Sequence, residues 1–221
     1  MAFKRSYVSR NRFRRPYFRK RNPWTRTRKP IGSYVTKTIP IDMDLAEGPN
    51  IFVCNAIAAD KRRYATSFYI KSVQIRGVAQ FPHDESAKFA GVHMVYTQTL
   101  KLNNEDCDKT GDLFKVKQEK ADAIFTTLFT AGGKGWLLED GVNNKTILSK
   151  VTTIKESDEK AASKSYGEDL AIDRYYKFKY GQGSVSYGSD ILIPENGLVV
   201  LALHVPHYTN LKGSIRVRYQ V

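Results

Sequence analysis

The sequence predicts an all-β protein whose body is a single antiparallel jelly roll, an eight-stranded β-sandwich with long loops and one or two short helices. Three observations predict this fold. Seven segments rich in β-branched and aromatic residues are either alternating or apolar throughout. The strand–helix alternation typical of parallel sheets is missing. With 41% hydrophobic residues, the chain after residue 30 is long enough to bury a core without disulfide bonds.

The first two predicted strands follow a disordered N-terminal arm. Segment 33–42 alternates, with Tyr34, Thr36 and Thr38 on one side and Val35, Lys37 and Ile39 on the other. Segment 65–81 also alternates, but its apolar period slips before Val73 and again at Gly77, and we expect β-bulges at these slips.

The middle of the chain carries three further β-rich segments and one helical one. Segments 91–102 and 145–157 are predicted strands, and 174–188 reads as a strand with a Gly-x-Gly break and a short partner. Between Gly111 and Gly132, residues 112–129 are the best helical candidate.

The last two strands have the clearest patterns. Segment 197–208 is continuously apolar, as expected for a strand buried on both faces. Segment 214–221 alternates, with Ile215, Val217 and Tyr219 predicted to face the core and Arg216 and Arg218 to face outward.

Charge divides the chain into a basic arm, residues 1–30, and a body, residues 31–221. The chain has 36 basic and 22 acidic residues, and the arm holds 12 of the basic residues and none of the acidic ones. The remaining 24 basic and 22 acidic residues leave the body nearly neutral. The arm also contains six aromatic residues and no long apolar run, so it is predicted to be disordered.

Cations interleaved with aromatic rings are suited to single-stranded nucleic acid, because the cations neutralise phosphates and the rings stack on unpaired bases. The residues predicted to bind nucleic acid are Lys4, Arg5, Arg10, Arg12, Arg14, Arg15, Tyr17, Phe18, Arg19, Lys20, Arg21, Trp24, Arg26, Arg28 and Lys29. Arg216 and Arg218 are predicted secondary contacts, although a solvated sheet face or a subunit interface explains them equally well.

The same arm fits a nuclear localisation signal, which needs only a short basic cluster. That cluster consists of Arg12, Arg14, Arg15, Arg19, Lys20 and Arg21. Nuclear import receptors are therefore expected partners. No segment approaches the roughly 18 apolar residues of a membrane helix, so no membrane partner is expected.

Catalytic and metal-binding motifs are weak, and we expect neither an enzyme nor a cofactor. Cys54 and Cys107 are far apart and form no Cys-x-x-Cys motif, which favours a reducing compartment. His204 and His207 form a His-x-x-His pair, but Pro206 interrupts it and both are expected at a surface or loop edge. The Tyr176-x-x-Lys179 pattern of nucleic-acid nicking enzymes lacks their His-hydrophobic-His metal pair, so Tyr176 is expected to pack in a strand. Acidic clusters at 42–47 and 103–108 are interpreted as solvated loops.

Three parts of the sequence resemble the coat proteins of small circular single-stranded DNA viruses, most closely those of geminiviruses and genomoviruses. They are the Arg/aromatic arm with "RNPWTRTRKP", the strand "FYIKSV" at 68–73, and the C-terminal succession from "DRYYKFKYGQGSVSY" through "LVVLALHV" to "GSIRVRYQV". The chain is shorter than geminivirus coat proteins and lacks the Cys/His cluster sometimes proposed there as a zinc finger.

The resemblance implies a jelly-roll capsid protein that assembles with copies of itself into an icosahedral shell of sixty, either a T=1 particle or half of a twinned one. The arm would bind the single-stranded DNA genome inside, and the protein would occur in the virion and the host nucleus. One alternative is a non-structural nuclear shuttle or movement protein that binds single strands without forming a shell. Another is a basic-tailed cellular RNA-binding protein, but the nearly neutral body argues against it.

Overall fold

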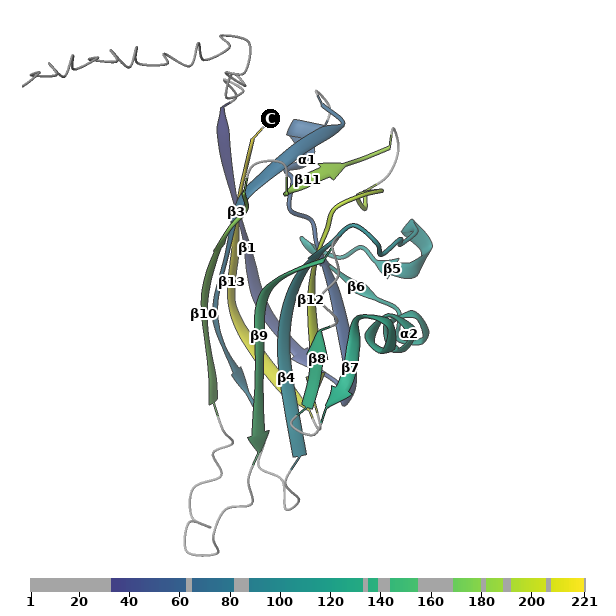
Figure 1. The fold of residues 1–221 in the computed structure, drawn as a ribbon, viewed down its shortest axis with the longest axis vertical. Helices are drawn as coiled ribbons and strands as arrows, with labels where there is room; N and C mark the ends of the chain where they lie inside the picture. The colour runs from purple at the N-terminus through teal and green to yellow at the C-terminus, as the bar shows by residue number, and fades with distance from the viewer. Residues whose placement is uncertain are drawn as a thin grey trace, which may run out of the picture. The chain divides into compact units, whose positions relative to one another are not determined.

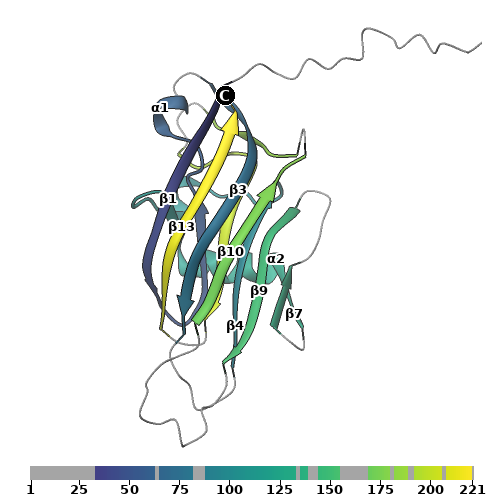
Figure 2. The same cartoon turned by 90° about the vertical axis from the view of Figure 1, so that its left-hand side faces the viewer.

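Two antiparallel sheets face each other in the computed structural model of the protein (Figures 1 and 2). The residues that the structure describes are 33–62, 65–81, 88–132, 135–138, 144–154, 169–179, 182–188, 192–205 and 208–220. They all belong to Gly32–Val221, which forms one compact unit. The prediction of an all-β sandwich is confirmed.

Sheet A has five strands and sheet B has six. Sheet A runs in the order β1 (Tyr34–Leu45), β13 (Thr209–Gln220), β3 (Ser67–Gln80) and β10 (Asp169–Lys177), with β11 (Ser184–Ser186) also paired to β3. Sheet B runs in the order β5 (Cys107–Asp108), β6 (Leu113–Val116), β2 (Gly48–Cys54), β12 (Leu198–Val205), β4 (Lys88–Thr97) and β9 (Asn144–Ile154). The remaining elements are the hairpin β7 (Phe129–Gly132) and β8 (Gly135–Leu138), the helices α1 (Ala59–Arg62) and α2 (Gln118–Leu128), and the short 3₁₀ helix η2 (Asn104–Asp106).

Eight of these strands form four nested antiparallel pairs. β1 pairs with β13, β2 with β12, β3 with β10, and β4 with β9. In chain order these strands are first with eighth, second with seventh, third with sixth and fourth with fifth. The first and third pairs lie in sheet A, and the other two lie in sheet B.

The main core lies between the two sheets and draws one face from each. On β13, Ile215, Val217 and Tyr219 are fully buried in this core, while Arg216 and Arg218 are exposed on the other face. The predicted alternation of the last strand is therefore confirmed at these five positions. Gln220, which the same alternation places on the side of Arg216 and Arg218, is buried.

Sheet B is also covered on its second face, by a separate cluster that includes residues of α2 and β6. Phe125 and Ile124 of α2 lie in this cluster with Val200 and Ala202 of β12. The alternate β12 residues, among them Leu201 and Leu203, lie in the main core. The prediction that this strand is buried on both faces is confirmed.

The helix predicted over 112–129 is only partly correct. Its first part, Leu113–Val116, is the strand β6, and α2 begins at Gln118. Phe114 and Val116 alternate into the outer cluster of sheet B, because pairing with β2 gives them a buried face that a helix starting earlier would not.

β2 was not among the predicted strands, and the short segment that forms β11 was predicted to pair with the strand before it. Both β10 and β11 instead pair with β3, at successive positions along the same strand. β2 was overlooked because its apolar run is only four residues long, Ile51 to Cys54, and a Gly-Pro pair stands close before it.

One of the two expected bulges is present, and the other position has a different explanation. The register between β3 and β13 shifts between Ile70 and Ser72, opposite Arg218 and Tyr219. At Gly77 the register is continuous, and Gly213 lies directly opposite. A Cβ atom on either glycine would overlap a backbone carbonyl oxygen of the facing strand, so the close approach of the two backbones requires glycine.

Candidate nucleic-acid interface

The arm residues predicted to bind nucleic acid or import receptors, between Lys4 and Lys29, lie outside the described residues. Those assignments stay predictions. Of the predicted contacts, Arg216 and Arg218 are described, and both project from β13 on the face of sheet A that points away from the core.

The strand register shows which side chains share this outer face with the two arginines. Figure 2 looks onto it, with β1, β13, β3 and β10 side by side. Arg218 lies between Thr36 and Ser72, and Arg216 lies between Thr38 and Gln74. On the far side of β3, Lys177 of β10 lies beside Ser72, and Tyr175 lies beside Gln74. The outer face therefore has one row across the strands that contains Arg218 and Lys177, and a second row that contains Arg216 and Tyr175.

A groove of about 320 Å³ crosses these strands. It is lined by Tyr34, Thr36, Ser72, Gln74, Tyr175, Arg216 and Arg218. Tyr34 is 52% exposed and Tyr175 is 57% exposed, so neither ring is buried in the core. The guanidinium of Arg218 lies over the ring of Tyr34, 4.6 Å from its centre, which holds a cation and an aromatic face together.

Charge is distributed unequally along the outer face of sheet A. The half that contains the groove has three exposed cations, Arg216, Arg218 and Lys177, and none of them forms an ion pair with a described carboxylate. In the next row, Arg76 is paired with Asp173, with 3.2 Å between Nε and Oδ1. We call the first half the basic half, because the register places no acidic residue on it.

Carboxylates occupy the opposite half. Asp42, Asp44, Asp169 and Asp173 project there, accompanied by Arg76 and Lys212. Hydrogen bonds from the Tyr208 hydroxyl and from the Asn210 amide lower the pKa of Asp44, so its carboxylate is ionised at neutral pH. This acidic half repels phosphate, whereas the basic half attracts it.

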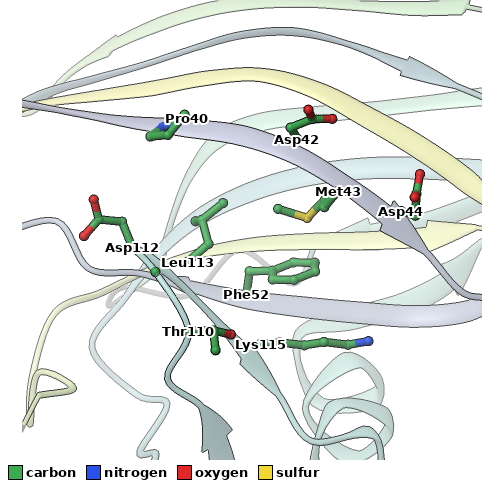
Figure 3. Close-up of a pocket in the computed structure, with 10 residues that line it drawn as sticks. Pro40, Asp42, Met43, Asp44, Phe52, Thr110, Asp112, Leu113 and Lys115 are labelled. Carbon is green, nitrogen blue, oxygen red and sulfur yellow. The ribbon is translucent and has the colours of Figure 1, made fainter.

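A larger cavity, of about 670 Å³, lies at the edge of the sandwich between β1, β2 and β6 (Figure 3). Met43, Phe52 and Leu113 point into it and give it an apolar wall (Figure 3). Asp42, Asp44 and Asp112 stand around it. Asp112 accepts a 2.8 Å hydrogen bond from the ammonium of Lys37, a largely buried cation that also donates to the carbonyl of Asn55. Lys115 is the one further cation in the described lining, and the carboxylates of Asp42 and Asp44 outnumber it, which makes the cavity a poor phosphate site.

The weaker motifs have structural explanations where they are described. Tyr176 packs edge-on against Phe178, with 4.9 Å between ring centres, as expected for a packed side chain. His204 is a half-buried residue next to the end of β12, with its ring centre 5.7 Å from that of Phe125, and His207 lies outside the described residues. The acidic run at 42–47, expected as a loop, begins inside β1. Within the described ranges there is no group of three or more His, Cys, Asp or Glu side chains that could hold a metal ion.

A search for membrane spans finds no helix among the described residues with the length and apolar character needed to cross a bilayer. In comparisons with known proteins, no protein-family model matches the sequence. A search of curated proteins finds no match either.

The sequence patterns pointed to the two arginines of this groove but not to its two tyrosines. Alternation had placed Tyr34 on the hydroxyl-bearing side of the first strand, which was a usable signal for exposure. No such signal separated Tyr175 from Tyr176. The pairing of β10 with β3 turns Tyr175 outward and leaves Tyr176 packed on the core.

Proposed function

We propose that this protein is the capsid protein of a small circular single-stranded DNA virus, which packages its genome through the basic arm. One observation carries the proposal: nearly all of the net charge of +14 sits in the first thirty residues, joined to a body that is close to neutral. A subunit that coats a polyanion needs this division, because a uniformly basic body would repel its own copies when they assemble.

The strand order of the body supports a jelly roll. Four nested antiparallel pairs divided between two sheets are what results when a long ribbon of paired strands is rolled into a sandwich. Double-sheet jelly rolls of this kind are used by viral capsids, and also by lectins and cupins. The architecture alone therefore does not distinguish a capsid protein from a lectin or a cupin, and the basic arm is the feature that favours the capsid protein.

The arm supplies affinity without sequence selectivity. If most of its 12 cations contact single-stranded phosphates, log K falls with log salt with a slope of order −6 to −8. Stacking of unpaired bases on Tyr17, Phe18 or Trp24 contributes about 1–3 kcal/mol per base. Neither interaction reads base identity, which suits packaging of a whole genome.

Assembly places sixty or a multiple of sixty copies in a closed icosahedral shell, with repeated contacts between bodies. The arms then face the enclosed DNA. Before assembly the same basic cluster serves as the nuclear localisation signal that brings new subunits to the host nucleus, where the genome is copied.

Electron microscopy of the purified full-length protein after nuclease treatment tests the proposal. We expect closed, uniform shells that protect single-stranded DNA. Monomers or small oligomers under every salt and pH condition would reject the capsid assignment. They would favour the shuttle or movement protein, which binds single strands without enclosing them.

A further inference from the structure

We propose that the body carries a nucleic-acid site of its own, in which the groove on the basic half of sheet A binds unpaired nucleotides of single-stranded DNA. The phosphates lie against Arg216 and Arg218, and a base stacks on Tyr175. This inference rests on the proposed function for its ligand, the packaged strand. It adds a second contact that is separate from the arm.

The first argument is the uncompensated charge of the groove. Arg216 and Arg218 form no ion pair with a described carboxylate, whereas Arg76 on the same face is paired with Asp173. An exposed arginine whose charge is not neutralised within its own sheet is able to form bidentate hydrogen bonds with a phosphate.

The second argument is spacing. Arg216 and Arg218 alternate on one strand, so their Cα atoms lie about 7 Å apart. That separation resembles the distance between successive phosphates of an extended single strand. A single DNA strand is therefore able to place two neighbouring phosphates against Arg216 and Arg218.

The third argument is the position of the rings. Tyr34 and Tyr175 come from β1 and β10, which are separated by β13 and β3, so the rings flank the arginines across about 14 Å of sheet. Bases in a duplex stack on each other and offer no free face, so exposed rings select unpaired bases. Flat sheet surfaces with aromatic side chains bind single strands in the same way in other folds.

The groove also has the size and lining of a nucleotide site. Its volume of about 320 Å³ lies at the lower end of the range for small-ligand pockets. Thr36, Ser72 and Gln74 line it with neutral donors and acceptors, which are able to hydrogen-bond a sugar or a base edge without repelling phosphate. The carboxylates of the acidic half confine the strand to this end of the sheet.

Binding of fluorescein-labelled oligothymidylate to the full-length protein, measured by anisotropy over a salt series, tests the site. We expect the double variant Arg216→Gln/Arg218→Gln to make the salt slope shallower by about 1.4, from two phosphate contacts at roughly 0.7 each. Arg76→Gln/Lys212→Gln removes the same charge from the same face and is expected to leave the slope unchanged. Tyr175→Ala is expected to weaken binding roughly 5- to 150-fold, the equivalent of 1–3 kcal/mol for one stacked base, with the slope unchanged.

Tyr208→Ala, which removes a similarly exposed ring from the acidic half, is the control for Tyr175→Ala and is expected to have no effect. Cross-linking gives an independent readout. A bromodeoxyuridine-substituted strand, irradiated on the wild-type protein, is expected to label peptides that contain Tyr34 or Tyr175 as well as the arm.

The outcomes separate this inference from the proposed function. Shells and tight oligothymidylate binding that are insensitive to the Arg216, Arg218 and Tyr175 variants, with cross-links confined to residues 1–30, would overturn the second site and leave the capsid assignment standing. An equal loss of duplex binding in Tyr175→Ala would overturn the stacking role. Absence of both shells and oligothymidylate binding in the wild type would reject the proposed function itself.

Discussion

Truncation of β12 on its two faces tests the double burial of sheet B. Leu201 belongs to the core between the sheets and Val200 to the outer cluster, and both side chains are fully buried. Leu201→Ala is expected to lower the free energy of unfolding by about 3–5 kcal/mol. Val200→Ala removes two carbon groups, which is about 1.6 kcal/mol of transfer free energy at roughly 0.8 kcal/mol each, and the cavity it leaves raises the loss to about 2–3 kcal/mol.

Urea unfolding followed by circular dichroism measures both losses. The control is Thr38→Ala, which removes the same number of heavy atoms from an exposed position and is expected to change the free energy of unfolding by no more than about 0.5 kcal/mol. A loss for Val200→Ala that does not exceed the control would refute the reasoning, because the second face of sheet B would then be open to solvent rather than covered.

Three further predictions concern single sites. Gly213→Ala is expected to lower the free energy of unfolding by about 1–3 kcal/mol, because the added Cβ would overlap a backbone carbonyl of β3. Gly111→Asn, at a positive φ of 72° with open space around it, is expected to lower it by less than about 1 kcal/mol. Equal losses for the two variants in chemical denaturation would contradict the close approach of β3 and β13 as the reason for glycine at 213. Burial raises the pKa of Cys54 to about 12 and that of Cys107 to about 11, so both thiols should resist iodoacetamide at pH 8 until the protein is unfolded, and mass spectrometry of the native protein should find neither alkylated. Burial, with a smaller contribution from His204, lowers the pKa of His93 from 6.5 to about 4. As the pH falls through this interval the unfolded chain binds a proton that the folded protein does not, so about 3 kcal/mol of stability should be lost between pH 7 and 4, and His93→Gln should remove that part of the pH dependence in urea titrations.

The sequence predicted several elements with no help from the fold, where a pattern within one segment was sufficient. Alternation correctly assigned the core and solvent sides of the last strand from Ile215 to Tyr219, and an unbroken apolar run correctly indicated a strand covered on both faces. Patterns within one segment were not sufficient at Leu113–Val116, where a helix was predicted and a strand is observed. The four residues Leu113–Val116 show no clear strand or helix pattern of their own, and a helix follows directly. They form a strand because they pair with β2.

The candidate interface shows the same limit. Arg216 and Arg218 were identified because they alternate with apolar residues, but Tyr34 and Tyr175 lie far apart along the chain and come to one groove only through β13 and β3. The sequence also showed no sign of the unequal distribution of charge along the outer face of sheet A, because only the register brings Asp42 and Asp169 to one half and Arg216 and Arg218 to the other.

By itself, the sequence determined the strand character of the body, the two-sided burial of β12 and the concentration of positive charge in the first thirty residues. Each of these depends on composition or on the period of side chains along one segment, which a single chain displays directly. Only the tertiary structure decided which strands are neighbours, which tyrosine of the pair at 175 and 176 faces outward, and where cations and rings meet. Register is a property of two paired strands, and a shift of one residue would turn every side chain to the opposite face.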